Sequence, residues 1–544
     1  MADREELTGM IADVVTGRFF PGVVTIRSGR IESVTEKDVP VDKYILPGLI
    51  DAHIHIESSM LTPAQFAAIA VRHGTVATVS DPHEIANVLG EKGIEFMIRN
   101  GKEVPFKFFF GVPSCVPATG FESSGAVINA SQVARLLEDN QLWYLSEMMN
   151  FPGVLFDDPE VVAKLDAARK AGKPVDGHAP GLRGKEAAKY AAAGITTDHE
   201  CFTLEEAEEK IGYGIKVQIR EGSAARNFDD LAPLLKKYPN HVMLCSDDRH
   251  PDDLLQGHMN LLIRKAIKLG YDPINVLRAC TMNPVNHYGI PVGLLKPGDC
   301  GDMVVVNNLE EFRVMETWID GKKVFDGEKV LFTPPAGDTP NHFRVSRVQP
   351  DQLRVPYEGG RLKVIKALEG QLVTERMVTE PHVENGNVTS DTGRDILKVV
   401  VLNRYNPSKP AIAFIHGLGL KKGAIASTVA HDSHNIIAAG TSDEDLALAI
   451  NRLIDSKGGI AAVSGKQISL LPLPVAGIMS DQPGEKVAGA YLALNEFVKE
   501  LGSPLKAPFM TLSFMALLVI PELKISDKGL FDGKEFKFTS LFEI

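Results

Sequence analysis

The sequence PGLIDAHIHIESSM occupies residues 47–60 and contains two histidines in an H-x-H pattern. We interpret the apolar run of residues 44–50 as a strand that leads into this motif. His53 and His55 are two residues apart, so on extended chain both side chains point to the same face. Two imidazoles at the end of a strand suit a transition-metal ion, with Asp51 as a supporting partner. An H-x-H pair alone is more often two solvated loop histidines, so this interpretation depends on the rest of the chain.

Short apolar runs alternate with amphipathic stretches from about residue 46 to residue 292. Helical patterns, such as residues 84–100 and 158–171, separate most of these runs. After the first strand, the strand candidates are residues 76–80, 108–112, 144–147, 174–176, 196–198, 216–219 and 242–246. Eight strands alternating with helices over this length predict a (β/α)8 barrel, in which the chemistry takes place at the carboxyl ends of the strands.

The segments on either side of the barrel contain short strands and turns. Neither has enough apolar surface for a stable domain of its own. We therefore expect an α/β chain in which the barrel, residues 47–293, is inserted in a small β-sandwich formed by residues 1–46 and 294–338. Three prolines near residue 338 mark a linker, and residues 345–544 are expected to form a C-terminal α+β domain.

Metal-binding residue types follow six of the eight strand candidates. They are His53 and His55, Asp81 and His83, Glu147, His178, His199 between Asp198 and Glu200, and Asp247 with Asp248. We expect about enough nitrogen and oxygen ligands for two divalent ions, bridged by a carboxylate and a hydroxide, from His53, His55, Glu147, His178, His199 and Asp247. This set contains no cysteine, which favours Mn²⁺, Fe²⁺ or Zn²⁺ over a thiolate site.

Longer motifs surround these residues. The first strand motif and the later SDD are typical of the amidohydrolase superfamily. The chain more closely resembles its adenine deaminase family in the stretches HGTVATVSDPHEIANV (73–88), LSEMMNFPGV (145–154), DGHAPGL (176–182), TDHE (197–200), SDDRHPDDL (246–254) and HGLGLKKGAIASTVAHDSHNI (416–436). The resemblance covers essentially the whole chain.

The resemblance implies hydrolytic deamination of adenine to hypoxanthine and ammonia, a reaction of purine salvage, with two Mn²⁺ or Fe²⁺ ions per chain. It assigns His53 and His55 to the buried ion, and His178 and His199 to the outer ion. Glu147 stands where many relatives have a carboxylated lysine and would bridge the ions. Asp247 would ligate the buried ion and transfer the proton during the reaction. A homodimer is the family's expectation.

The chemistry of adenine is consistent with these roles. Attack at C6 needs a hydroxide near neutral pH, and a metal lowers the pKa of bound water to about 7. The ring nitrogen and the departing amine must each gain a proton, which suits a carboxylic acid or a histidine near the metals. We expect Asp247 to move the proton, with His83 as an electrostatic or proton-transfer partner. Glu147 is a further candidate for ring protonation, although a carboxylate that bridges two cations is a poor acid.

Recognition of the base is expected from the loops that follow the strands. The candidates are Glu57, Ser58, Ser59, Asp81 and Asp248, whose carboxylates and hydroxyls match the donor and acceptor edges of a purine. The competing interpretation is that Glu57 and Ser58 cap the helix that begins near Thr62. The motif His431–His434 is interpreted as pocket closure or structure rather than as a separate metal site. We also hypothesise that the C-terminal domain forms a wall that excludes adenosine.

Composition excludes several classes of function. Lysine plus arginine number 58 and aspartate plus glutamate number 70, which gives a net charge of −12. This balance argues against a nucleic-acid partner or an anionic membrane surface. The five cysteines include no C-x-x-C pair, so the zinc signature of cytidine deaminases is absent and a reducing cytoplasm is expected.

Two other functions remain as alternatives. A cyclic-amide hydrolase of the dihydroorotase or hydantoinase kind would use the same barrel and a similar histidine set. Glu147 at the bridging position favours a deaminase. A catalytically inactive barrel scaffold would usually have lost ligands, and none of the expected set is missing here.

Overall fold

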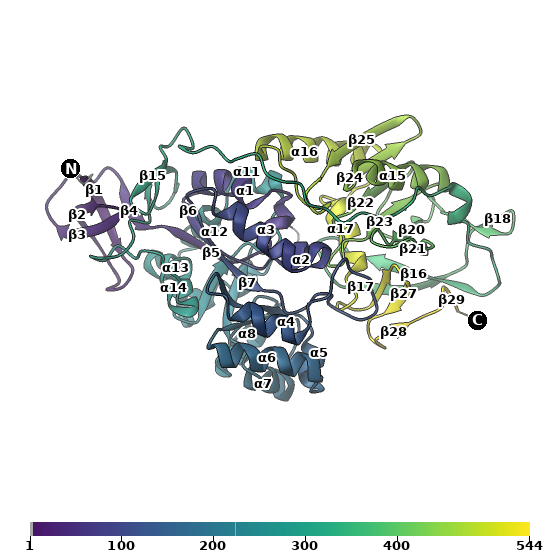
Figure 1. The fold of residues 1–544 in the computed structure, drawn as a ribbon, viewed down its shortest axis with the longest axis horizontal. Helices are drawn as coiled ribbons and strands as arrows, with labels where there is room; N and C mark the ends of the chain where they lie inside the picture. Colours follow the sequence, from purple (N-terminus) through teal and green to yellow (C-terminus); the bar gives the residue numbers. More distant parts are fainter. Residues whose placement is uncertain (1–3, 224, 544) are drawn as a thin grey trace.

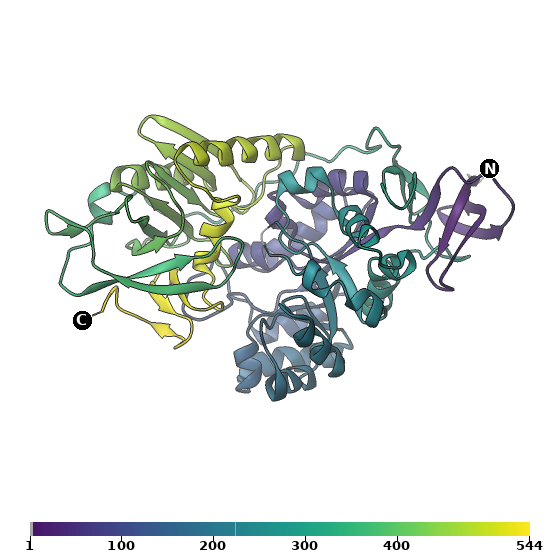
Figure 2. The ribbon, with the colours of Figure 1, turned by 180° about the vertical axis from the view of Figure 1, so that it is seen from behind.

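The computed structural model describes residues 4–223 and 225–543. They form three adjoining parts arranged in a row, with the first strands at one end and the last strands at the other (Figure 1). The view from behind shows the same order, with the barrel in the middle (Figure 2).

Eight parallel strands build the middle part, as the strand pattern predicts. One sheet contains β5 (Leu49–Ile54), β6 (Thr75–Ser80), β7 (Lys107–Val112), β8 (Leu142–Met148) and β9 (Val175–Gly177), and a second contains β10 (Thr197–Asp198), β11 (Lys216–Arg220) and β12 (Val242–Cys245). Backbone hydrogen bonds join the two sheets at both seams. Thr196 N donates to Val175 O at 2.8 Å, and Asp247 N donates to His53 O at 2.9 Å. The sheet is thereby closed into a barrel.

Helices cover the outside of this barrel and bury their apolar faces against it. The major ones are α1 (Pro63–Ala70), α2 (His83–Leu89), α3 (Glu91–Gly101), α4 (Ala130–Leu137), α6 (Pro159–Ala171), α7 (Gly184–Ala192), α8 (Leu204–Gly212), α11 (Pro251–Gln256), α12 (Met259–Lys268), α13 (Pro273–Ala279) and α14 (Met282–Tyr288). In α3, Ile94 and Met97 are buried three residues apart, the spacing of one helical face. Asn129 forms a capping box at the start of α4, and Asp158 caps α6.

Strands from before and after the barrel form one continuous seven-stranded sheet. Its order is β15 (Lys322–Phe325), β14 (Val314–Ile319), β13 (Met303–Val306), β4 (Tyr44–Pro47), β1 (Arg4–Asp13), β2 (Arg18–Arg27) and β3 (Arg30–Glu36). Side chains from both halves, such as Val24 and Trp318, share one apolar core. The single strand expected over residues 44–50 is wrong, because the chain leaves this sheet after Pro47 and enters the barrel at Leu49.

The C-terminal part is built on a nine-stranded sheet. Its strands are β16 (Arg361–Ala367), β17 (Thr374–Thr379), β20 (Ile396–Leu402), β21 (Ala411–His416), β22 (Ala424–Ser427), β23 (Ile436–Gly440), β24 (Gly459–Ser464), β25 (Gln467–Pro472) and β29 (Phe542–Glu543). Helix α15 (Asp443–Ser456) buries Leu446 and Ile450 against it. Helix α16 (Gly484–Glu500) contacts α1 and α11, so one apolar core extends from the barrel into this part.

Among the described residues, no helix combines the length and the apolar character needed to cross a lipid bilayer.

A buried lysine joins three segments of the C-terminal part. Lys524 lies on β26 (Leu523–Ser526) and is fully buried. Its ammonium group donates to Leu372 O at 2.7 Å and to Phe514 O at 2.9 Å. Burial without a nearby carboxylate lowers the pKa of Lys524 to about 7, because the charged form loses its hydration.

We expect the Lys524→Met variant to change how stability depends on pH. Between about pH 7 and the ordinary pKa of 10.5, the unfolded chain binds more protons than the folded chain. The wild-type midpoint of thermal unfolding should therefore rise, relative to that of the variant, as the pH increases from 7 to 10. Lys537→Met, at an exposed lysine, is the control and should show no such trend. A constant difference between wild type and Lys524→Met across this range would contradict the assignment.

Candidate active site

Glu147, at the end of β8, lies at the centre of a ring of histidines. Its Oε1 is 3.2 Å from His55 Nε2, and its Oε2 is 2.8 Å from His178 Nδ1 and 3.3 Å from His199 Nε2. Each carboxylate oxygen therefore faces a different side of the ring. Burial opposes ionisation, but His178 and the neighbouring imidazoles hold the pKa of Glu147 well below its usual range.

Asp247, after β12, completes the ring from the other side. Its Oδ1 is 3.6 Å from His53 Nε2 and 3.3 Å from His55 Nε2. Its Oδ2 accepts a hydrogen bond of 2.7 Å from Arg220. Burial raises the pKa of Asp247, but Arg220 and the histidines overcome this and lower it well below the usual range. The backbone of Asp247 has a φ of 54°, an uncommon conformation for a non-glycine residue that often marks functional sites.

The barrel explains why these side chains meet. His53, Glu147, His178, His199 and Asp247 each lie at or just beyond the carboxyl end of a different strand, and parallel closure brings those ends to one rim. All of them are buried. The six metal-ligand candidates of the sequence therefore form one cluster.

The same cluster has the properties of a metal site. Both ring nitrogens of His53, together with His178 Nε2 and His199 Nδ1, are buried without hydrogen-bond partners among the described residues. Such orphaned buried atoms are uncommon in native proteins and call for a ligand or an ion. The three-residue groups His53–His55–Asp247, His53–Glu147–His199 and His178–His199–Glu200 each place donor atoms within 4.8 Å of one another. Imidazole nitrogen and carboxylate oxygen suit Mn²⁺, Fe²⁺ and Zn²⁺.

Asp51 does not contact the rings of the H-x-H pair. Its Oδ1 accepts from Ser246 N at 3.0 Å, and its Oδ2 lies 2.8 Å from His258 Nε2. The carboxylate beside His53 is instead Asp176, whose Oδ2 lies 4.0 Å from His53 Nδ1. Asp51 therefore supports the loop that follows β12 rather than orienting the imidazole of His53.

His83 begins α2 and lies next to the ring. Its Nδ1 is 3.1 Å from Asp81 Oδ2 and 3.6 Å from Glu147 Oε1, and its Nε2 is 3.7 Å from Asp432 Oδ1 of the C-terminal part. Burial disfavours the imidazolium, but Asp81 and Asp432 raise the pKa of His83 well above its usual value. Asp81, a candidate for substrate binding, is thus placed to orient His83.

Of the five candidates for substrate binding, Asp248 lines the cavity at the cluster and the other four lie behind its wall. Ser58 Oγ donates to Asp248 Oδ1 at 2.6 Å, and Ser59 Oγ donates to Ile56 O at 2.6 Å. Glu57 Oε1 accepts from Ile85 N at 3.3 Å. The competing helix-cap interpretation is wrong, because no side chain caps α1 at Thr62 and residues 56–59 form a separate 3₁₀ turn.

The cavity is small and has two different walls. Its volume is about 30 Å³, and its polar wall consists of the histidine ring and neighbouring acidic residues. The opposite wall is apolar and comes largely from the C-terminal part, with Leu372, Phe514 and Leu517 beside Met149. Lys524 bonds to the backbone of Leu372 and of Phe514, so it fastens two segments of this wall.

No role is assigned from the sequence to Arg220, Glu200 or Glu84, which line the cavity. Arg220 and Glu200 pair through two contacts, and Glu84, His431 and Asp432 also line the cavity. The places of Arg220 and Glu200 in the sequence could have indicated their role, since Arg220 ends β11 and Glu200 follows His199. The motif of residues 431–434 was expected to close the pocket or to be structural, and His431 and Asp432 do line the cavity.

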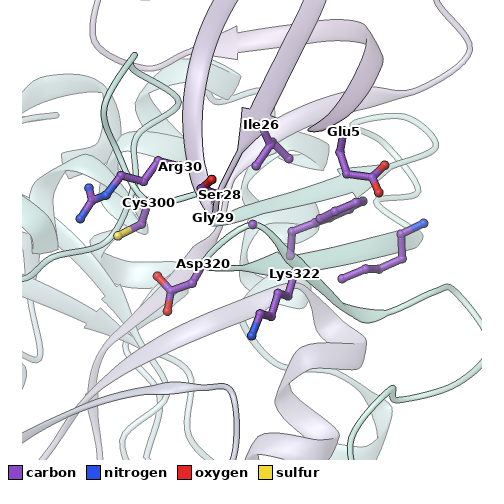
Figure 3. Close-up of a pocket in the computed structure, with 11 residues that line it drawn as sticks. Glu5, Ile26, Ser28, Gly29, Arg30, Cys300, Asp320 and Lys322 are labelled. Atoms are coloured by element: carbon purple, nitrogen blue, oxygen red, sulfur yellow. The ribbon is translucent and has the colours of Figure 1, made fainter. Parts of the chain in front are cut away.

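A larger, open cavity of about 730 Å³ lies far from this cluster, on the seven-stranded sheet. Figure 3 shows Arg30, Cys300, Asp320 and Lys322 around it. Arg30 donates to Gly298 O at 2.8 Å, and Asp320 pairs with Lys107 at 2.8 Å. Arg30 and Asp320 therefore have partners within the chain, and the described residues that line this cavity include no histidine, so it does not resemble the metal-type cluster.

Comparison with known proteins agrees with the geometry. The model of the amidohydrolase family matches residues 44–324, and that of the adenine deaminase C-terminal domain matches residues 371–537. An adenine deaminase of Methanosarcina mazei is 54% identical and covers 98% of this chain and 99% of its own. Those of Sulfurovum sp. and Borreliella burgdorferi are 52% and 46% identical, covering 98% and 97% of this chain and 99% and 97% of their own. The chain therefore belongs to the adenine deaminase family of the amidohydrolases.

Proposed function

We propose that this chain catalyses the hydrolytic deamination of adenine to hypoxanthine and ammonia. The observation that carries the proposal is the ring of buried imidazoles around Glu147, in a chain that matches adenine deaminases over nearly its full length. The polar and apolar residues that line the cavity match the polar edge and the apolar faces of a flat, neutral base.

We propose two divalent ions per chain, Mn²⁺ or Fe²⁺, with Zn²⁺ as a further candidate. His53, His55 and Asp247 would hold one ion, and His178 and His199 the other. Glu147, with one oxygen toward each side, would lie between them. When bound, such ions lower the pKa of a water molecule to about 7 and so supply a nucleophile at neutral pH.

Asp247 is the proposed proton carrier. Arg220 holds Oδ2, so Oδ1 is the oxygen turned toward His53 and His55, which would hold an ion with it. From there Asp247 would accept a proton from water and deliver it to the departing amine. His83, held between Asp81 and Asp432, would stabilise the charge that develops on the base. Glu147 is the further candidate for protonating the ring nitrogen.

The cellular role follows from the product and the chain's composition. A free base that is converted to hypoxanthine fits purine salvage. The net charge of −12 is unsuited to nucleic acid. All five cysteines are unpaired, and four are buried, which suits a reducing cytoplasm. A homodimer is proposed from the family resemblance.

The direct test combines metal analysis with an activity assay. Protein produced with added Mn²⁺ should contain about two ions per chain and convert adenine to hypoxanthine, with release of ammonia. Metal removal should abolish turnover, and Mn²⁺ should restore it. Opening of dihydroorotate or hydantoin without deamination of adenine would favour the cyclic-amide alternative, and absence of bound metal would favour an inactive scaffold.

Asp247→Asn tests the proton carrier. The amide can still ligate through its oxygen but is a poor base, so we expect most of the metal to remain. Turnover should fall by roughly 10²- to 10⁴-fold, the usual contribution of a positioned acid or base. Metal content and kcat are measured on the same sample, with exposed Asp229→Asn as the control. Wild-type kcat in metal-replete Asp247→Asn protein would remove this role from Asp247.

A further inference from the structure

A second polar cluster lies beside the histidine ring, where the barrel meets the C-terminal part. His431 Nδ1 is 3.1 Å from Glu84 Oε1. Ser58 Oγ lies 3.1 Å from the same oxygen and donates to Asp248 Oδ1 at 2.6 Å. Glu84 and Asp248 directly follow His83 and Asp247 in the chain, and both line the cavity with His431. The cluster therefore belongs to the same cavity as the proposed catalytic groups. Its two carboxylates come from the residues that directly follow those groups in the chain.

One oxygen of this cluster has no partner. Glu84 is fully buried, and its Oε2 accepts no hydrogen bond from the described residues. A buried carboxylate oxygen without a donor is unfavourable, whereas His431 lies within hydrogen-bond distance of the other oxygen of Glu84. Because Glu84 lines the cavity, the missing donor is best supplied by a molecule bound there.

The surroundings of this oxygen suit the edge of an aromatic base. Phe514 stacks on His431 with ring centroids 4.8 Å apart and an interplanar angle of 18°. Leu372 and Leu517 continue the same wall. A flat base whose face packs on this wall would have its polar edge free for a carboxylate that lines the same cavity, such as Glu84.

We propose that Glu84, oriented by His431, accepts the N–H of the five-membered ring of adenine and thereby selects the free base over its nucleoside. This proposal rests on the proposed function. Free adenine has one N–H in that ring, on N9 or N7, whichever tautomer binds. In adenosine the glycosidic bond occupies N9 and no ring N–H remains. The carboxylate of Glu84 would then stay unpaired, and a site built to bond an N–H discriminates strongly against ligands that lack it.

The test compares two inhibitors that differ only at this nitrogen. Hypoxanthine retains an N–H in its five-membered ring, and 9-methylhypoxanthine does not. In Glu84→Met, the inhibition constant of hypoxanthine should rise by roughly tenfold or more, the usual effect of losing a charge-assisted hydrogen bond. The constant of 9-methylhypoxanthine should change by less than about threefold, because it makes no such bond in the wild type. Glu84→Gln retains one acceptor oxygen and should recover part of the loss.

His431→Gln tests the positioning role, since it should raise KM for adenine more than it lowers kcat. His434→Gln is the matched control, because His434 is buried in the same motif but does not line the cavity. The His434→Gln variant should leave the ratio of the inhibition constants of hypoxanthine and 9-methylhypoxanthine unchanged.

Failure of the two proposals can be told apart. If metal-replete wild type does not deaminate adenine, the proposed function fails. If it does, but both inhibitors weaken equally in Glu84→Met and in Glu84→Gln, the role of Glu84 is overturned while the function stands.

Discussion

The closed ring of eight parallel strands is the constraint on which the rest of the structure depends. It brings imidazoles and carboxylates from separate strand ends to one buried rim, around the carboxylate of Glu147. So many titratable groups would be costly to bury without compensation, because charged and polar atoms lose hydration there. Mutual ion pairs offset part of this cost, and the orphaned ring nitrogens of His53 show where compensation by a cation is still needed.

The C-terminal part is a structural component of the site rather than an appendage. Asp432 faces His83, His431 faces Glu84, and Phe514 supplies an apolar wall. A barrel rim alone would leave the cluster open to water, which weakens electrostatic interactions by its high dielectric constant. Lys524 is buried between two backbone carbonyls of this wall. Its two hydrogen bonds are formed at the cost of the hydration that the ammonium group loses on burial.

The barrel and the cluster of metal-type side chains could be predicted because they depend on local patterns. Strand-helix alternation has a recognisable period, and His53, Glu147 and His199 lie at or shortly after the ends of predicted strands. The residues that line the cavity could not all be predicted in the same way. Glu57 and Ser59 lie only two and four residues beyond His55, yet their side chains bond to backbone atoms and do not line the cavity. Which side of a short turn faces a cavity depends on packing across the whole barrel.

The amino-acid sequence by itself determined the fold class, the family and the metal-type residues at the strand ends, because hydrophobic periodicity and motif spacing are local properties of the chain. Only the tertiary structure decided that Arg220 pairs with Asp247 and that Glu84 contacts His431. It also decided that the carboxylate of Asp51 supports the loop after β12 rather than the imidazole ring of His53. Glu84 and His431 are separated by nearly 350 residues in the chain. Contacts over such distances are formed by the packing of complete domains, and no local pattern records them.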